Sequence, residues 1–219
     1  TNEHVFFTIG DRGNRDVNPQ NVTIDGGKIY RLNLDGSVPN DNPFINVDNS
    51  IDAIYSYGHR NPQGIINGFK DNDIWIHEHG PRGGDEINII KKPNQNEDPL
   101  KERNYGWPKA TYGINYSGSE ITKNRTLENV IDPFYYWTPS IAPSGMAYLN
   151  SDIYPEWKNS ILVGSLKFLY LERLEFNDDG VIKREKLFPG VGRVRDVNIS
   201  PNGYVYVNVE AIGIFKIVP

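Results

Sequence analysis

The sequence has no cysteine, which excludes disulfide bonds, thiolate nucleophiles and cysteine-based zinc or iron–sulfur sites, and leaves the cellular compartment open. It has no run of about 18 apolar residues, so no membrane-spanning helix is expected. Basic residues form no cluster, and the formal net charge of the 219 residues is −5. Because nucleic-acid binding requires many phosphate contacts, this charge argues against nucleic acid as the main partner.

Glycine and proline are abundant instead, with 21 and 15 residues, while hydrophobic residues make up 37% and aromatic residues 12%. This composition supports a core and is typical of many short strands joined by tight turns. No window of about 12 residues carries an apolar period of 3.6, so the chain is predicted to be all-β. Residues 91–103 are expected to form an exposed excursion. The expected strands cover residues 5–9, 28–34, 53–57, 73–77, 87–90, 134–137, 146–149, 160–164, 169–176, 191–197, 204–209 and 212–218.

Polar turn motifs recur near residues 10–13, 58–64, 140–145 and 193–197. Gaps of this order suit units of roughly 40–50 residues, as in the blades of a β-propeller. Repetition of strand and loop around an axis would bring the loops of one rim together. A β-sandwich is the structural alternative, because turn spacing alone does not separate the two folds.

The stretch from Tyr57 to Glu86 holds the two most distinctive loops. GHRNPQG occupies residues 58–64, and HGPRGGDE occupies residues 79–86, with an expected strand between them. Glycine permits positive φ and close backbone approach, and proline pre-sets a turn. Two such polar loops in succession are expected to form two walls of one small-molecule site. The alternative is that both are ordinary surface turns, which use the same residues.

Six motifs, taken in order, carry a family resemblance: GHRNPQG, EHGPRGGDEIN, NYGWP, PSIAPSGM, GSLK and RVRDV. Together they resemble the soluble PQQ-dependent aldose sugar dehydrogenases, also called the glucose/sorbosone dehydrogenase family. The resemblance extends over nearly the whole chain. It implies a six-bladed β-propeller with the quinone cofactor on its top face. Residues 1–219 are then expected to form a single domain that corresponds to about the last four blades.

The resemblance also implies a set of cofactor-binding residues. Arg60 and Asn61 match the pair that contacts the quinone carbonyls, and Ser140 matches a small hydroxyl residue facing the cofactor. Lys167, Arg193 and Arg195 match the cations that hold the carboxylates of PQQ. A flat tricarboxylate needs several cations, and arginine binds a carboxylate with two parallel hydrogen bonds.

Arg193 and Arg195 are two residues apart, so on a strand they project from the same face. The alternative for this pair is a solvated strand face that forms ion pairs with Asp196 or Glu185.

A calcium ion on the cofactor is the second expectation from the resemblance. Gly80 and Pro81 match the residues whose backbone carbonyls bind this Ca²⁺, and Asp85, Glu86 and Tyr105 match positions of structural calcium in some members. Calcium takes oxygen ligands, for which carbonyls beside glycine and proline are well suited. The alternative for Asp85 and Glu86 is a pair of ordinary turn carboxylates.

The family's catalytic base is a histidine ahead of the strand that leads to the turn at residues 10–13. None of the chain's four histidines occupies that place: His4, His59, His77 and His79. The base and the first blades are therefore expected outside this chain, which is predicted to be a fragment. Pairing with another copy, as a homodimer, is the alternative. His77 and His79 are interpreted as hydrogen-bonded loop histidines, and Trp107 and Trp137 as core or wall residues.

The resemblance implies an oxidoreductase that oxidises the C1 hydroxyl of aldose sugars to lactones and passes the electrons to an external acceptor. A periplasmic or secreted location is the family expectation, although the first residues show no signal-peptide pattern. A non-catalytic propeller that binds a protein or glycan partner is the alternative function. A pure binding module has no need for a set of cations that fits a tricarboxylate, which favours the enzyme.

Overall fold

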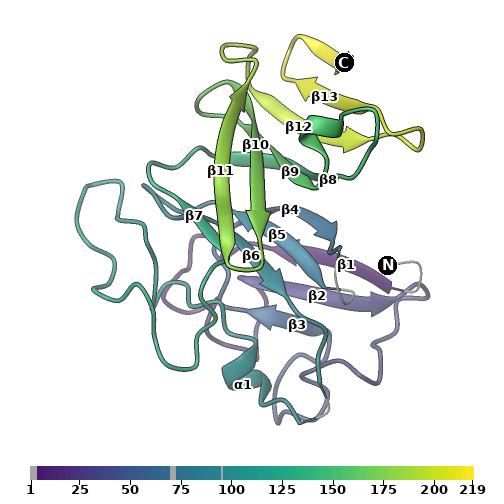
Figure 1. Ribbon diagram of the computed structural model, residues 1–219. Helices are drawn as coiled ribbons and strands as arrows, with labels where there is room; N and C mark the ends of the chain where they lie inside the picture. Colours follow the sequence, from purple (N-terminus) through teal and green to yellow (C-terminus); the bar gives the residue numbers. More distant parts are fainter. Residues whose placement is uncertain (1–3, 70–72, 95) are drawn as a thin grey trace.

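Four antiparallel sheets follow one another along the chain in the computed structural model, which describes residues 4–69, 73–94 and 96–219 (Figure 1). The first sheet holds β1 (His4–Ile9), β2 (Lys28–Asn33) and β3 (Ile54–Tyr57). The second holds β4 (Pro62–Asn67), β5 (Ile74–Glu78), β6 (Asp85–Ile90) and β7 (Tyr135–Trp137). The third holds β8 (Pro143–Leu149), β9 (Ser160–Ser165), β10 (Tyr170–Asn177) and β11 (Gly180–Leu187). The fourth holds β12 (Val194–Ile199), β13 (Val205–Val209) and β14 (Gly213–Lys216).

The sheets are consecutive blades of a β-propeller, which confirms the predicted fold class. Each blade is built in chain order, so that its strands pair only with their neighbours in sequence. Strands β4, β8 and β12 begin the second, third and fourth blades, and β8 contacts both β4 and β12. These three strands therefore lie side by side on the inner edge of their blades.

Two blades differ from the expected four-stranded form. Within the described residues, the first and the fourth sheet have three strands each. β1 runs toward the turn at Gly10 and pairs with β2, whereas β4, β8 and β12 run away from the corresponding loops. In direction, β1 therefore matches the second strand of a complete blade rather than its innermost strand.

Two strands, β4 and β11, were not expected from the sequence. β4 begins at Pro62 and contains Gly64, residues that indicate a turn. β11 is an outer strand with mostly exposed residues, so its polar run carries little apolar alternation. The predicted excursion at residues 91–103 contains one helical turn, α1 (Pro99–Glu102). Asp98 caps this turn by accepting a hydrogen bond from the backbone N–H of Leu100.

The hydrophobic core lies between successive blades. One cluster joins Ile29 of β2 to Ile76 of β5, and a second joins Trp137 of β7 to Val163 of β9. A third joins Leu162 of β9 to Val207 of β13. Because each blade packs through side chains on its face, the alternating apolar residues of the strands determine this stacking.

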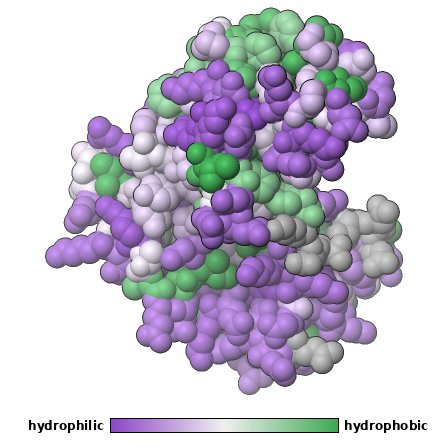
Figure 2. Space-filling model, in the orientation of Figure 1, coloured by the Kyte–Doolittle hydropathy of each residue, from purple (hydrophilic) through white to green (hydrophobic). Residues whose placement is uncertain are grey.

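The visible surface in Figure 2 is mostly hydrophilic, and hydrophobic residues gather toward the top, where the fourth blade lies in Figure 1. There β14 is exposed along its whole length, and Ile214 is 72% exposed. Within the described ranges, no helix is long and apolar enough to cross a membrane.

The contact between the third and fourth blades predicts a large effect of one methyl group. Gly145 has a φ of 55°, and a Cβ there would lie 2.5 Å from the Cα of Asp196. Gly190 has a φ of 82°, but a Cβ there meets no atom within 4 Å. Both alanine variants carry left-handed strain, so their difference isolates the clash. We expect Gly145→Ala to lower the free energy of unfolding by about 1–3 kcal/mol more than Gly190→Ala.

Chemical denaturation of the two variants measures this difference directly. Equal losses of stability would show that β8 and β12 do not approach each other as closely as the structure indicates.

Candidate active site

The loops that the sequence predicts on one face do lie on one rim. They join β3 to β4, β5 to β6, β7 to β8, β9 to β10 and β11 to β12. Hydrogen bonds connect these loops across the blades. His79 Nε2 lies 2.7 Å from the Pro143 carbonyl oxygen, and the Ala142 N–H donates to Asp85 Oδ2 at 2.8 Å. The Ser144 hydroxyl donates to the Val194 carbonyl. The rim is therefore one connected surface built from three blades.

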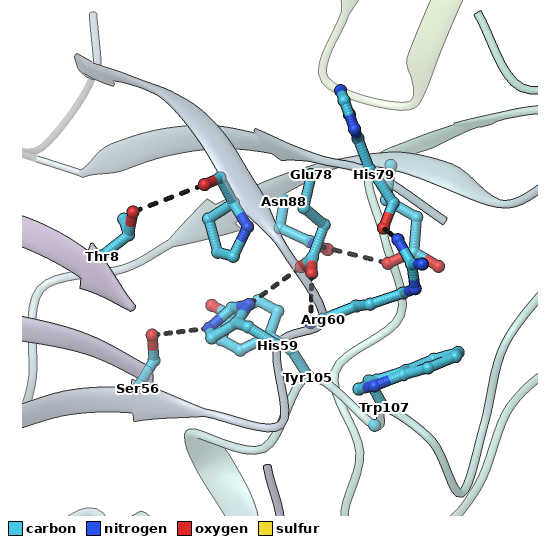
Figure 3. A network of polar contacts seen from close by, with 12 residues as sticks. Thr8, Ser56, His59, Arg60, Glu78, His79, Asn88, Tyr105 and Trp107 are labelled. Carbon is cyan, nitrogen blue, oxygen red and sulfur yellow. Dashed lines mark hydrogen bonds and ion pairs between the residues drawn. The ribbon is translucent and has the colours of Figure 1, made fainter. Parts of the chain in front are cut away.

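Arg60 lies in the loop between β3 and β4, and its guanidinium is held firmly (Figure 3). Its Nη1 donates to the carbonyl oxygens of His79 at 2.7 Å and Gly80 at 2.9 Å. The guanidinium also lies 5.5 Å from the centroid of the Trp107 ring, a cation–π contact. The Trp107 indole N–H donates to Asp11 Oδ2 at 2.9 Å, so this tryptophan serves as wall, as expected.

A buried polar network fixes the backbone next to Arg60, and sequence reasoning missed it (Figure 3). His59 Nδ1 lies 2.9 Å from Glu78 Oε1, and His59 Nε2 lies 2.8 Å from the Ser56 hydroxyl. Glu78 Oε2 accepts the Arg60 backbone N–H at 2.6 Å. Asn88 Nδ2 donates to Glu78 Oε1 at 3.0 Å. In the sequence, the only indication of this network was the position of Glu78 between His77 and His79.

This serine–histidine–glutamate geometry resembles a hydrolase triad, but Ser56 and His59 are both 0% exposed. A buried serine cannot reach a substrate, so we interpret the network as structural. Burial raises the pKa of the Glu78 carboxyl, but His59 and the Arg60 N–H outweigh this effect and hold the pKa below its usual value. The ionised carboxylate thereby positions the backbone of Arg60.

Asn61 and Ser140 also lie at the rim. Asn61 Oδ1 accepts a hydrogen bond from Gln63 at 3.1 Å, and its backbone carbonyl accepts from His79 at 3.0 Å. Ser140 is 8% exposed, and its buried hydroxyl has no hydrogen-bond partner within the described residues. Arg60, Asn61 and Ser140 thus come from loops that the hydrogen bonds between His79, Asp85 and the third blade bring together.

The candidate calcium ligands fall into two groups. Asp85 accepts the Gly80 N–H with one carboxylate oxygen at 2.8 Å and the Ala142 N–H with the other, so both of its oxygens tie rim loops together. Burial raises the pKa of Asp85. Pro81 is buried beside Gly80, whose carbonyl faces Arg60.

Glu86 follows Asp85 at the start of β6 and lies opposite Glu78 in the pairing of β5 and β6. Burial, and then the charge of Glu78, raises the pKa of Glu86 well above its usual value. Asn88 donates to Glu86 Oε2 at 3.3 Å. A void of about 10 Å³ is lined by both glutamates and Tyr105 and, toward the rim, by Arg60 and Gly80; its volume suits one water or ion.

Tyr105 does not turn its hydroxyl toward this void. The hydroxyl donates to the Ile89 carbonyl at 2.8 Å, and the ring stacks on His59 with centroids 4.7 Å apart. Within the residues that the structure describes, no group of three or more acidic, histidine or cysteine side chains is arranged to hold a metal. A metal bound here would therefore need backbone carbonyls among its ligands.

The three remaining cations, Lys167, Arg193 and Arg195, are exposed at the rim. Arg193 Nε lies 2.5 Å and Arg195 Nη2 lies 2.9 Å from the two carboxylate oxygens of Glu210. The two arginines share a face, as predicted. Their ion-pair partner is Glu210 rather than the proposed Asp196 or Glu185. Sequence reasoning missed it because it follows β13 and reaches Arg195 only through strand pairing.

His77 differs from its interpretation as a hydrogen-bonded loop histidine. It lies in β5, is 0% exposed, and within the described chain neither ring nitrogen has a hydrogen-bond partner. Gly64 leaves the space for its ring, because a Cβ there would lie 2.3 Å from Nε2. Burial, together with the nearby His79, lowers the pKa of His77 to about 3.

This burial predicts acid sensitivity. The unfolded chain takes up a proton near pH 6.5, whereas the folded chain resists it until about pH 3. Stability is therefore lost as pH falls through this window, by about 3 kcal/mol at pH 4 from this group. We expect His77→Asn to flatten the dependence of unfolding free energy on pH between 6.5 and 4. His4→Asn, on β1, is the control. Parallel pH profiles of wild type and His77→Asn would contradict the assignment.

A propeller rim that combines carboxylates, carbonyls and exposed cations is a candidate small-molecule site on a β-propeller. The family model for glucose/sorbosone dehydrogenase matches residues 1–214, and the chain belongs to this family. Aldose sugar dehydrogenase YliI of Escherichia coli is 41% identical over 207 residues, covering 93% of this chain and 53% of the relative. The chain spans about half the length of the curated relatives it matches.

Solved structures agree with this assignment. The soluble aldose sugar dehydrogenase from Escherichia coli in the apo-form matches with a TM-score of 0.86 at 38% identity, covering 98% of this chain and 60% of that chain. The PQQ-bound form of aldose sugar dehydrogenase from Streptomyces coelicolor matches with a TM-score of 0.67 at 27% identity, covering 96% and 54%.

Proposed function

We propose that the protein carrying this chain is a PQQ-dependent aldose dehydrogenase and that this chain supplies much of its cofactor site. The observation that carries the proposal is the set of four cations on one rim, Arg60, Lys167, Arg193 and Arg195. They come from three blades, and Lys167, Arg193 and Arg195 are exposed. A flat tricarboxylate is the class of ligand that such a set suits. The PQQ-bound relative supports this choice.

Each residue has a distinct role in this proposal. Lys167, Arg193 and Arg195 hold carboxylates, and Arg60 and Asn61 face the quinone. PQQ, when bound, accepts the two electrons of the substrate. Arg60 now donates to the Gly80 carbonyl, which is also a proposed calcium ligand. A carbonyl oxygen has two lone pairs, so this one could serve the proposed ion while it accepts from Arg60.

No histidine of this chain is assigned as the base. His59 and His77 are fully buried, and His79 Nε2 is engaged with the Pro143 carbonyl. His4 lies on β1, apart from the rim. We propose that the base comes from a part of the protein outside these 219 residues. We also propose that the substrate is an aldose oxidised at C1 to the lactone, that an external acceptor takes the electrons, and that the protein acts in the periplasm or outside the cell.

Calcium is proposed at two places. The carbonyls of Gly80 and Pro81 serve the ion on the cofactor. The adjoining void, lined by Glu78, Glu86 and Tyr105 and bordered by Arg60 and Gly80, serves a structural ion, because two neighbouring carboxylates there share one amide donor, Asn88. A divalent cation relieves the repulsion between them.

The test is a dye-reduction assay on the full-length protein after incubation with PQQ and CaCl₂, using a panel of aldoses. We expect activity that depends on both additions, and no useful rate from the 219-residue chain alone. A full-length protein that binds PQQ but oxidises no aldose would overturn the substrate proposal. One that does not bind PQQ would overturn the cofactor proposal and favour the binding-module alternative.

Glu210 provides a finer prediction for the same site. It occupies both arginines that are proposed to hold PQQ, and Arg195 and then Arg193 lower the pKa of its carboxyl. Its carboxylate therefore competes with those of the cofactor. We expect Glu210→Gln to tighten PQQ binding about threefold to tenfold, measured by quenching of tryptophan fluorescence. Weaker binding would mean that Glu210 orients the arginines instead of competing for them.

A further inference from the structure

A cavity of about 550 Å³ lies between the second and third blades, and none of the proposed cofactor residues lines it. Tyr170 and Glu172 of β10 and Arg184 and Lys186 of β11 line it from the rim end of their sheet. Residues 139–141 and the loops after β9 and β11 close the sides. Its volume is typical of a small-molecule site.

The charges in the cavity favour an anion. Glu172 is 0% exposed, accepts the Trp137 indole N–H at 2.6 Å and receives two bonds from Arg184, at 2.9 and 2.7 Å. Glu172 and Arg184 thus neutralise each other. Lys186 lines the same cavity, and no salt bridge to it is formed within the described chain; its Nζ lies 5.3 Å from the Tyr170 ring centroid. One positive charge is left uncompensated.

The apolar part of the lining favours a flat ligand. The rings of Phe168 and Tyr170 lie in nearly parallel planes, 6° apart, with centroids separated by 6.2 Å. Pro139 and Pro189 add two more flat apolar surfaces. Phe168 is 41% exposed, although Lys167 Nζ lies 5.1 Å from its ring centroid, so part of the ring can contact a ligand. Offset stacking of an aromatic face on a planar ligand stabilises the complex.

We propose that this cavity is a binding site for a planar organic anion, with Lys186 holding the carboxylate and Phe168 contacting the ring. The site borders the proposed PQQ site, because Lys167 Nζ lies 5.1 Å from the centroid of the Phe168 ring. Its occupant is a monocarboxylate or similar small anion, because Lys186 is the one cation of the cavity lining that forms no ion pair within the described chain. The proposal does not depend on the dehydrogenase activity.

Isothermal titration of the full chain with 2-naphthoate, without PQQ, tests this site. We expect one molecule bound per chain and at least tenfold weaker binding of the neutral 2-naphthylmethanol. Lys186→Gln is expected to weaken 2-naphthoate about tenfold. Phe168→Ala should weaken both probes. Lys183→Gln is the matched control, because Lys183 lies on the same strand and its Nζ lies 3.4 Å from Glu175. It should bind both probes as the wild type does.

A further variant separates this cavity from the cofactor site. Arg195→Gln should bind 2-naphthoate as tightly as the wild type. Loss of binding in Arg195→Gln would place the probe on the cofactor rim and overturn the proposal. No binding, equal affinity for the neutral probe, or an unchanged affinity in Lys186→Gln would overturn it as well.

Discussion

Replacing Arg60 with glutamine is expected to lower dye-linked aldose oxidation by the full-length protein about 10²–10³-fold, the scale of one lost electrostatic donor. Arg60 is the rim cation with the most restricted geometry, because Glu78 holds its backbone and Trp107 supports its guanidinium. Glutamine keeps a hydrogen-bond donor but removes the charge. Arg60→Lys keeps the charge but loses the planar fork, so an intermediate rate is expected.

Initial rates at saturating PQQ and CaCl₂ measure this effect, and thermal unfolding shows whether the variants remain folded. Lys183→Gln is the control, since Lys183 is exposed on β11 and pairs with Glu175 away from the rim cations. A wild-type rate for a folded Arg60→Gln variant would remove Arg60 from the proposed cofactor site.

Without PQQ, calcium is expected to raise the melting temperature of the wild type, and Glu86→Gln is expected to abolish this rise. The ion on the Gly80 and Pro81 carbonyls is proposed to need the cofactor as a further ligand, so without PQQ the calcium response depends on the carboxylates that line the void, Glu78 and Glu86. At a calcium concentration about 100 times the dissociation constant, the wild type should gain about 2.7 kcal/mol. The variant loses a charged ligand and should gain almost nothing.

In EDTA the order of stability should change. Glu86→Gln removes one of two neighbouring carboxylates, because Glu86 faces Glu78 across the strand pair. We therefore expect the metal-free variant to be at least as stable as the metal-free wild type. Glu120→Gln, an exposed loop carboxylate, should retain the full calcium response. An unchanged response in Glu86→Gln would argue against this void as a calcium site.

The all-β class was available from local signals in the sequence, and the propeller and the family from the resemblance carried by six ordered motifs. Alternating apolar residues and glycine-rich turns predict strands such as β1, β2 and β13 from their own residues. The six motifs keep their order along the chain regardless of how it folds. The position of the rim loops was also predictable, because strands that alternate in direction place every second loop at the same edge of the propeller.

Only the tertiary structure decided which side chains meet. Glu210 reaches Arg193 and Arg195 because β12 and β13 pair, and Glu78 faces Glu86 because β5 and β6 pair in one particular register. His77 has its low pKa because the blades enclose it. Burial, register and contact between distant segments depend on the packing of whole blades. Patterns of neighbouring residues do not contain this information. The sequence alone therefore predicted the loops of the rim but not the hydrogen bonds and ion pairs between their side chains.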